Sequence, residues 1–339
     1  MANLPLRFAD VEELEEYMTR PSAALERELA GIDEILVLGV GGKMGPTLAR
    51  MARRTGRRVI GVARFSDPGL REKLTDWGVE CIACDLLERA SLERLLRVKN
   101  IVFMAGHKFG AAGNPSLTWA MNVGVPFMVA ETFRDSSIVA FSTACVYPYA
   151  PVTGGGADET VRTTPPAGDY ANSCVGREQA FLYGSHRYGT AGRLMRLEYA
   201  IDMRYGVLHD VAAKVFADQP VDVTMGHVNL LWQGDANEQA LRLLAHATTP
   251  TSPINVSGPD VLSVRSLAQE FGKRFGKQPT IIGKEAPTAW LVDTTEAQRL
   301  LGAPRVPLSA MLDWQADWIA RRLPDLGKPT HFETRDGKY

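Results

Sequence analysis

The sequence contains few cysteines and no long run of apolar residues. Four cysteines in 339 residues do not make the disulfide framework of a small secreted protein. No apolar stretch approaches the roughly 20 residues of a transmembrane helix, and the N-terminal residues lack the basic and apolar regions of a secretory signal. We therefore expect a cytoplasmic protein with reduced thiols and no membrane partner.

An excess of charge of either sign is also missing. The 38 lysines and arginines nearly balance the 39 aspartates and glutamates, which leaves a formal net charge of −1. This balance gives no electrostatic footprint for a nucleic acid, so we expect no such partner. A metal is not expected either, because Cys81 and Cys84 have CxxC spacing but no second pair of ligands accompanies them.

Apolar runs alternate with segments of helical spacing through the first part of the chain. Strands are predicted at 34–40, 58–63, 79–84, 100–106, 137–147 and 193–200, and helices at 45–56, 67–77, 91–97 and 170–188. Strands that alternate with helices favour a parallel sheet with helices on its faces. The predicted fold class is α/β: a Rossmann-type, doubly wound parallel sheet with a smaller mixed C-terminal part.

Four regions follow from this pattern. They are a helical extension (1–33), a dinucleotide-binding Rossmann domain (34–195, with the strand at 193–200 completing its sheet), a substrate-binding part (201–325) and a polar tail (326–339). The acidic segment at 10–30 predicts a single amphipathic helix within the extension. Glycine and proline cluster at 148–168, which predicts a long loop.

A glycine-rich loop follows the first predicted strand. GVGGKMG places Gly39, Gly42 and Gly45 in a G-x-x-G-x-x-G pattern between a strand and a helix. The first glycine permits a tight turn, the second lets the backbone approach a pyrophosphate, and the third allows the helix to pack closely. The N-terminus of the helix adds hydrogen-bond donors. The loop therefore predicts a dinucleotide site, to which Lys43 and Met44 also contribute.

The end of the second predicted strand bears on the choice between NAD and NADP. Dinucleotide-binding folds commonly carry an acid there for the ribose hydroxyls, whereas this chain has Arg64 in VARFSD. The charge and forked donors of an arginine suit a 2′-phosphate, so NADP is the preferred prediction. NAD remains the alternative, because Asp67 can accept a hydrogen bond from a 2′-hydroxyl.

Several motifs occur together in the order typical of one protein family. They are the glycine loop at 39–45, CDLLE with Asp85, MAGHKFG at 104–110, FSTACVYP at 141–148, Tyr170 with Glu178, and NVSGPDVLSVRSLAQEFG at 255–272. On these motifs the chain, from about residue 34 to 322, resembles an extended short-chain dehydrogenase/reductase of the NAD-dependent epimerase/dehydratase type. MAGHKFG with the following NPSLTWAMNVG is similar to a pattern of UDP-galactose 4-epimerases.

The resemblance implies roles for individual residues. It places a set of residues against the cofactor: Asp85 near the adenine, Ala105 and Lys108 beside the riboses, and Leu86 and Gly106 next to them. It makes Thr143 the residue that hydrogen-bonds the reacting oxygen, and Tyr170 the acid/base and a cofactor contact. The C-terminal part would shape the substrate pocket, and such proteins are often homodimers through a four-helix bundle that includes the tyrosine helix.

One residue departs from the family pattern. A tyrosine, with a pKa near 10, is a poor base at neutral pH unless a nearby cation stabilises the phenolate. In this family that cation is a lysine four residues after the tyrosine, whereas this chain has Cys174. Lys108 or Arg177 could supply the charge instead. The alternatives are a lyase or isomerase that retains its cofactor and demands less of the tyrosine, and a dinucleotide-binding sensor or assembly partner without turnover.

Two further departures bear on the substrate. Family members that act on nucleotide sugars carry an asparagine where MRLEYA has Tyr199, preceded here by Glu198. They also carry a diphosphate-binding arginine ahead of a segment that reads GHVNLLWQGD (226–235) in this chain. Because a diphosphate needs cations or helix-end donors, we expect a small sugar, sugar acid or polyol rather than a nucleotide sugar. His107 lies beside the expected cleft and could carry a proton.

Overall fold

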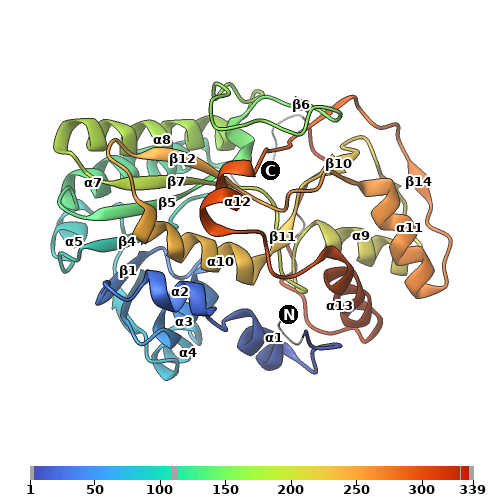
Figure 1. Ribbon diagram of the computed structural model, residues 1–339, viewed down its shortest axis with the longest axis horizontal. Helices are drawn as coiled ribbons and strands as arrows, with labels where there is room; N and C mark the ends of the chain where they lie inside the picture. The colour runs from blue at the N-terminus through green and yellow to red at the C-terminus, as the bar shows by residue number, and fades with distance from the viewer. Residues whose placement is uncertain (1–3, 109–112, 329, 336–339) are drawn as a thin grey trace.

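A central sheet with helices on both faces forms the larger part of the molecule in the computed structural model (Figure 1). The structure describes residues 4–108, 113–328 and 330–335. Residues 109 and 110 of the MAGHKFG motif and residues 336–339 of the predicted tail lie outside the described residues. Helices α7 (Val125–Thr132) and α8 (Asp169–Tyr188) lie on one side of the sheet, and α3 (Gly45–Arg54) and α10 (Gln233–Arg242) on the other.

The sheet has seven parallel strands, in the order β12-β7-β5-β4-β1-β2-β3. Their bounds are β1 (Glu34–Leu38), β2 (Arg58–Ala63), β3 (Glu80–Ala83), β4 (Asn100–Phe103), β5 (Ser137–Thr143), β7 (Gly192–Leu197) and β12 (Ser252–Val256). The predicted Rossmann-type α/β fold is confirmed. The strand order reverses between β1 and β4, which is where open parallel sheets bind ligands at their carboxyl ends.

Three of the four predicted connecting helices, α3 and the two at 67–77 and 91–97, are shorter than the sequence pattern predicted, whereas α8 agrees with its predicted bounds to within one residue. Besides α3, α7 and α8, the connecting helices are α4 (Leu70–Asp76), α5 (Arg89–Glu93) and α6 (Pro115–Trp119), with a π-helical turn, η2 (Ala120–Gly124), between α6 and α7. The helix expected at 91–97 ends at Glu93, although Leu92 and Leu95 are both buried. Among the described residues, no helix has the length and apolar character needed to span a membrane.

The sheet does not end with the strand predicted at 193–200. That strand, β7, ends at Leu197 and pairs on its far side with β12, which comes from the part assigned to the substrate. The five residues of β12 include Pro253, which lacks a backbone N–H and therefore suits an edge strand. The short length and the proline hid this strand in the sequence.

The single helix expected at 10–30 is two helices, α1 (Val11–Met18) and α2 (Ala23–Glu28). Pro21 separates them, because its ring disfavours helical geometry in the preceding residue and it cannot donate a hydrogen bond. Asp10 caps the first helix and Ser22 caps the second through their side-chain oxygens. Each cap satisfies a backbone N–H that a helix start leaves open.

The C-terminal part combines helices with two-residue strand pairs. Its elements, together with two short ones before α8, are η3 (Ala144–Val146), β6 (Ala150–Pro151), β8 (Ala200–Ile201), α9 (Val207–Phe216), β9 (Val221–Asp222), β10 (His227–Val228), β11 (Leu231–Trp232), η4 (Leu243–His246), β13 (Leu262–Ser263), α11 (Val264–Phe275), β14 (Ile281–Ile282), β15 (Thr288–Ala289), α12 (Thr295–Leu301) and α13 (Leu308–Ala320). The ring of Phe8 lies 4.9 Å from that of Trp314, centroid to centroid. The N-terminal extension therefore shares a core with this part.

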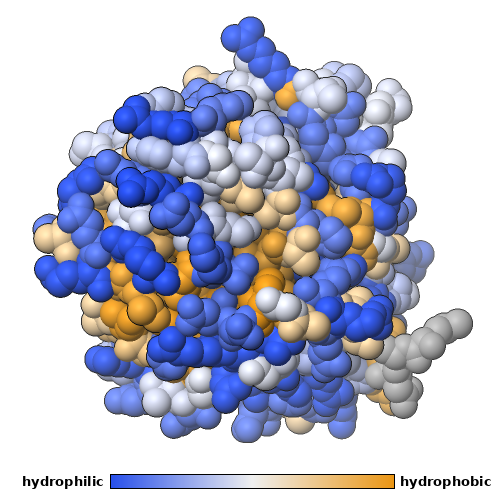
Figure 2. Space-filling model, turned by 60° about the vertical axis from the view of Figure 1, so that its left-hand side comes forward, coloured by the Kyte–Doolittle hydropathy of each residue, from blue (hydrophilic) through white to orange (hydrophobic). Residues whose placement is uncertain are grey.

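Apolar side chains are exposed on the side of the molecule that carries α6, α7 and α8. Trp119 is 40% exposed, Phe127 44% and Tyr183 51%, and the rings of Phe127 and Tyr183 are 6.1 Å apart. Figure 2, which turns the side with α7 and α8 forward, shows apolar residues gathered in a band between charged ones. A contiguous apolar surface with a polar rim is typical of an interaction site.

Candidate active site

A central cleft runs across the carboxyl ends of the strands, where the strand order reverses. It consists of three adjoining cavities that share Gly42 and Met104. Arg64 and Asp85 line its outer end. Its inner end, here named the inner pocket, encloses about 240 Å³ and is lined by Thr143. The cleft is thus long enough to hold an extended ligand with its reactive end at the inner pocket.

Most residues that the sequence indicated for the site come together in this cleft. Those that line it are Gly39, Gly42, Lys43, Met44, Gly45, Arg64, Asp85, Leu86, Ala105, Gly106, His107, Lys108, Thr143, Tyr170, Arg177, Glu198 and Tyr199. Cys174 is the exception, because its side chain is fully buried behind the wall of the cleft. In the described part of the chain, no group of three or more acidic, histidine or cysteine side chains is arranged to hold a metal ion.

The glycine loop forms the floor of the cleft between β1 and α3. Gly39 has a φ of +91°, and a Cβ there would lie 2.5 Å from the backbone nitrogen of Ala105, so no other residue fits without a backbone shift. Helix α3 begins at Gly45 with no side-chain cap at its N-terminus. The open backbone N–H groups and the positive end of the helix dipole favour an anion at this position.

Lys43 is the cation within this loop. Its ammonium donates a hydrogen bond to the backbone oxygen of Ala200 at 3.2 Å and lies 4.1 Å from the ring centroid of Tyr205. Burial lowers the pKa of Lys43 to about 7; Asp202 opposes this shift, while Lys108 and a second cation add to it. The side chain can therefore gain or lose its proton near neutral pH.

Arg64 and Asp67, the two residues that the sequence indicated for the ribose, both line the outer end of the cleft. Arg64 is exposed, and Lys328 from the C-terminal tail reaches the same cavity. Asp85 accepts a hydrogen bond from the backbone N–H of Leu87 at 3.0 Å, which fixes the turn after β3. The outer end therefore offers both cations and carboxylates to a nucleoside.

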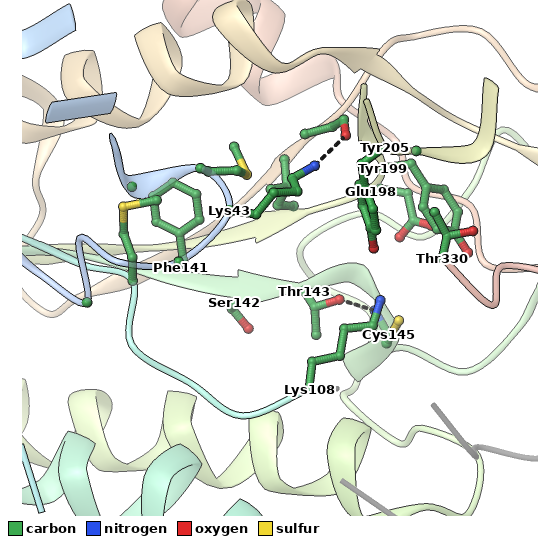
Figure 3. Close-up of a pocket in the computed structure, with 18 of the residues that line it drawn as sticks. Lys43, Lys108, Phe141, Ser142, Thr143, Cys145, Glu198, Tyr199, Tyr205 and Thr330 are labelled. Atoms are coloured by element: carbon green, nitrogen blue, oxygen red, sulfur yellow. Dashed lines mark hydrogen bonds between the residues drawn. The ribbon is translucent and has the colours of Figure 1, made fainter. Parts of the chain in front are cut away.

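Tyr170, near the start of α8, is hydrogen-bonded to Thr143 at the end of β5. The Thr143 hydroxyl also accepts from the backbone N–H of Cys145 at 3.2 Å (Figure 3). Burial raises the pKa of Tyr170 well above its usual value, and Cys174 and Cys145 add to the shift, whereas Arg177 and Thr143 oppose it. Tyr170 is therefore a neutral phenol that can donate a proton but is a poor base.

Cys174 lies one helical turn after Tyr170 and has no exposed surface. It packs in a small apolar cluster with Val146 and Val292 and is hydrogen-bonded to Tyr170. Burial raises the pKa of the Cys174 thiol, although the charge of Arg177 opposes the shift. The position that carries a lysine in the resembling family is thus filled by a small neutral group.

The two cations expected to replace that lysine have different surroundings. Arg177 donates hydrogen bonds to Asn122 Oδ1 at 2.6 Å and to the backbone oxygen of Phe141 at 2.9 Å, so it ties η2 to β5. Lys108 lies 5.6 Å from the ring centroid of Tyr170, within the range of a cation–π contact. Neither charge is sufficient to offset the effect of burial, which raises the pKa of the Tyr170 phenol.

His107 is held at the edge of the cleft by neighbouring polar groups. Its ring Nδ1 lies 2.9 Å from the hydroxyl of Thr118, and its backbone N–H donates to Asn122 at 2.8 Å. One ring nitrogen is therefore engaged with a buried hydroxyl. This arrangement fixes the ring beside the cleft and leaves its role in proton transfer a prediction.

A buried ion pair fixes the helix that carries Tyr170. Glu178 on α8 accepts from Arg196 on β7 through both carboxylate oxygens, at 2.7 and 3.0 Å, and from the hydroxyl of Ser142 at 2.6 Å. Arg196 also donates to the hydroxyl of Tyr147 at 2.6 Å. The motif residue Glu178 therefore joins α8 to two strands and sets the position of the phenol.

Two residues of the inner pocket carried no sequence signal. Tyr205 follows β8, and Thr330 comes from the C-terminal tail, where Asp210 accepts from its hydroxyl and backbone N–H at 2.5 and 2.9 Å. In Figure 3, Tyr205 and Thr330 lie with Glu198 and Tyr199 on one side of the pocket, and Thr143 on another. No local pattern could have indicated Thr330, because the tail reaches the pocket only after tertiary folding.

Comparisons with known proteins were made on sequence and on structure. The model of the NAD dependent epimerase/dehydratase family matches residues 35–201. The chain is similar to UDP-glucose 4-epimerase from Thermus thermophilus in complex with NAD, with 20% identity, a TM-score of 0.71, and coverage of 84% of this chain and 98% of that one. It is also similar to the Thermotoga maritima UDP-glucose 4-epimerase with UDP-glucose (17% identity, TM-score 0.70, 85% and 99% covered).

A third similar structure is UDP-glucuronic acid 4-epimerase from Bacillus cereus in complex with UDP-glucuronic acid and NAD (18% identity, TM-score 0.72, 85% and 99% covered). At these identities the similarity shows the shared fold. The comparison with curated protein sequences gave no match.

Proposed function

Because residues 35–201 belong to the NAD dependent epimerase/dehydratase family, we propose that the protein binds a nicotinamide dinucleotide in the central cleft. We further propose that it acts as an oxidoreductase or epimerase on a small sugar, sugar acid or polyol. The observation that carries this proposal is the hydrogen-bonded pair of Thr143 and Tyr170 at the inner end of a cleft whose floor is a glycine loop.

The residues of the cleft fit a nicotinamide dinucleotide. The glycine loop, the N-terminus of α3 and Lys43 would hold its pyrophosphate, and the outer end with Asp85 would hold the adenosine. When bound, this cofactor supplies hydride transfer. NAD in the similar Thermus thermophilus and Bacillus cereus structures supports the class of cofactor.

We propose a preference for NADP on the basis of Arg64. Arg64→Ala is expected to weaken NADPH binding by about 1.5–3 kcal/mol, the range of a charged hydrogen bond, and to leave NADH binding unchanged. Titration of both cofactors into the two proteins measures this, with Arg134→Ala, an exposed arginine outside the cleft, as the matched control. Equal affinities of wild type for NADPH and NADH would show that Arg64 does not select the 2′-phosphate.

In the proposed reaction Thr143 and Tyr170 orient one oxygen of the substrate between their two hydroxyl groups. Tyr170, as a neutral phenol, supplies a proton to that oxygen, and Lys108 against its ring stabilises the phenolate left behind. The lysine that assists the tyrosine in the resembling family is replaced by Cys174. This replacement favours a second candidate function, that of a dinucleotide-binding sensor without turnover. Oxidation of NADPH or NADH with a panel of sugar carbonyl compounds, by wild type and by Tyr170→Phe, separates the two functions.

The choice of a small substrate rests on the inner pocket and the cations near it. The resembling nucleotide-sugar enzymes carry an arginine ahead of the segment that reads GHVNLLWQGD in this chain, whereas residues 221–225, directly ahead of it here, include no lysine or arginine. The cations that line the inner pocket are Lys43 and Lys108. The UDP-sugars in the similar structures favour the competing interpretation, a nucleotide sugar.

A ligand panel decides between these substrate classes. With NADP or NAD present, glucuronate and galacturonate are expected to raise the melting temperature, whereas UDP-glucose and UDP-glucuronate are not. A ligand at 100 times its Kd stabilises the folded state by about 2.7 kcal/mol, which differential scanning fluorimetry detects. A large shift with a UDP-sugar and none with the free sugar acids would overturn the small-substrate proposal.

We also propose a homodimer through the face that carries Trp119, Phe127 and Tyr183, because these exposed apolar side chains lie on α8 and on its neighbours α6 and α7. The resemblance implies the same helix face for a four-helix bundle. Cytoplasmic localisation stays a proposal that rests on the sequence.

A further inference from the structure

Glu198 is a buried acid in the wall of the inner pocket. It follows Leu197, the last residue of β7, whose register partner in β5 is Thr143. Only 2% of Glu198 is exposed, yet it lines the inner pocket, and its carboxylate Oε1 has no hydrogen-bond partner among the described residues. A buried polar atom without a partner is uncommon in folded proteins, and Glu198 lines the inner pocket, so a ligand in that pocket is a candidate partner for its carboxyl group.

Other buried acids of the chain have an arginine partner. Glu178 pairs with Arg196 at 2.7 Å, and Asp202 pairs with Arg204 at the same distance. No such ion pair is made by Glu198 among the described residues. Glu198 is therefore exceptional in its lack of a counter-charge, not in its burial.

The groups that line the inner pocket around Glu198 favour the protonated, neutral form of its carboxyl group. Those around it are the cations Lys108 and Lys43, the phenols Tyr170, Tyr199 and Tyr205, the thiol of Cys145 and the hydroxyls of Thr143 and Thr330. Burial raises the pKa of Glu198 well above its usual value, and the charge of Lys108 opposes the shift only in part. An unpaired carboxylate in such surroundings is costly, which favours the protonated form of Glu198.

We propose that Glu198 is a carboxylic acid that donates a hydrogen bond to a second oxygen of the ligand in the inner pocket, beside the oxygen that takes its proton from Tyr170. The inference rests on the proposed function for the class of ligand. The proton of the carboxyl group stays on Glu198 during the reaction.

This role accounts for the departure from the family pattern at the tyrosine. The lysine that would assist Tyr170 is absent, and a second hydrogen-bond donor lines the same pocket, on the side with Tyr199 and Thr330 and away from Thr143 (Figure 3). Two donors on different sides of a small pocket can serve a ligand with more than one oxygen. Glu198 would thus act beside Tyr170 and not in place of it.

The protonation of Glu198 is tested without any ligand. Infrared difference spectra at pH 7 between wild type and Glu198→Gln are expected to show the loss of one carboxylic acid C=O band. Glu159→Gln, a half-buried acid outside the cleft that accepts from the backbone N–H of Asn255, is the matched control and should leave that band in place. Loss of a carboxylate band instead would overturn the inference and leave the proposed function intact. If Glu198→Gln does not fold, δ-¹³C-glutamate NMR titration of wild type gives the same pKa.

The role of Glu198 toward the ligand is tested by measuring the rate of carbonyl reduction as a function of pH, with the same panel of sugar carbonyl compounds. Because only the protonated acid donates, the wild-type rate should fall as the pH rises through the pKa of Glu198. Glu198→Gln, whose amide donates a hydrogen bond at every pH, should lose this alkaline decline, whereas Glu198→Leu should lose about 100-fold in rate, the lower range for removal of one hydrogen-bond donor from an active site. A profile of Glu198→Gln that matches wild type would overturn the donor role alone. Absence of turnover in wild type would overturn the donor role together with the proposed function.

Discussion

Cys174→Lys is expected to lower the free energy of unfolding by about 3–5 kcal/mol, the cost of an uncompensated buried charge. The wild-type thiol is fully buried among apolar side chains. Among the charges that act on this thiol, Arg177 has the largest effect, and it would repel an ammonium group. Glu178, the nearest acid on the same helix, is already paired with Arg196. Urea unfolding of wild type and Cys174→Lys measures the difference.

Cys174→Met is the matched control, because its side chain has nearly the length of lysine but no charge. Its free energy of unfolding should fall only by the cost of overpacking, about 1–3 kcal/mol. If Cys174→Lys instead keeps its stability and ultraviolet titration shows a lower pKa of Tyr170, the site is that of an ordinary member of the family from which the lysine was lost. A loss of stability means that the site has been rebuilt around the thiol.

The double substitution Phe127→Glu with Tyr183→Glu is expected to convert the proposed homodimer into a monomer. A two-fold interface contains every substituted residue twice, so two changes bring four like charges into one contact surface. Each unpaired buried charge costs several kcal/mol, which predicts an increase of more than about 1,000-fold in the dimer Kd, since every 1.4 kcal/mol is tenfold. Sedimentation equilibrium measures the Kd.

Ile282→Glu is the control for this experiment. Ile282 is 46% exposed and apolar, but it lies on β14 in the C-terminal part, away from α7 and α8. Its substitution should leave the dimer intact. Wild type that sediments as a monomer at micromolar concentration would contradict the proposed interface.

The sequence by itself determined six of the seven strands of the parallel sheet. The strand predicted at 58–63 is β2 with the same bounds, because strands covered on both faces read as continuous apolar runs. The glycine loop could also be predicted, because the turn at Gly39 requires a positive φ that only glycine adopts freely. Both signals are local: they depend on neighbours along the chain.

Part of the candidate site could also be assigned from the sequence. Tyr170 and Thr143 are hydrogen-bonded, and Cys174 lies one turn after Tyr170, as helical spacing predicted. That Arg177 is bound to Asn122 could not be predicted, because its partner comes from a different helix. The sequence indicated which charges were near the phenol, but not which of them were engaged elsewhere.

Only the tertiary structure decided the remaining features. The edge strand β12 pairs with β7 across a separation of more than fifty residues, and Thr330 reaches the inner pocket from the C-terminal tail. Whether a buried acid such as Glu198 has a counter-charge depends on which arginines the fold brings near it. Local spacing fixes which residues share a strand or a helix face. Contacts between distant segments are set by the packing of the whole chain, and these contacts decide which polar groups stay unpaired and face a ligand.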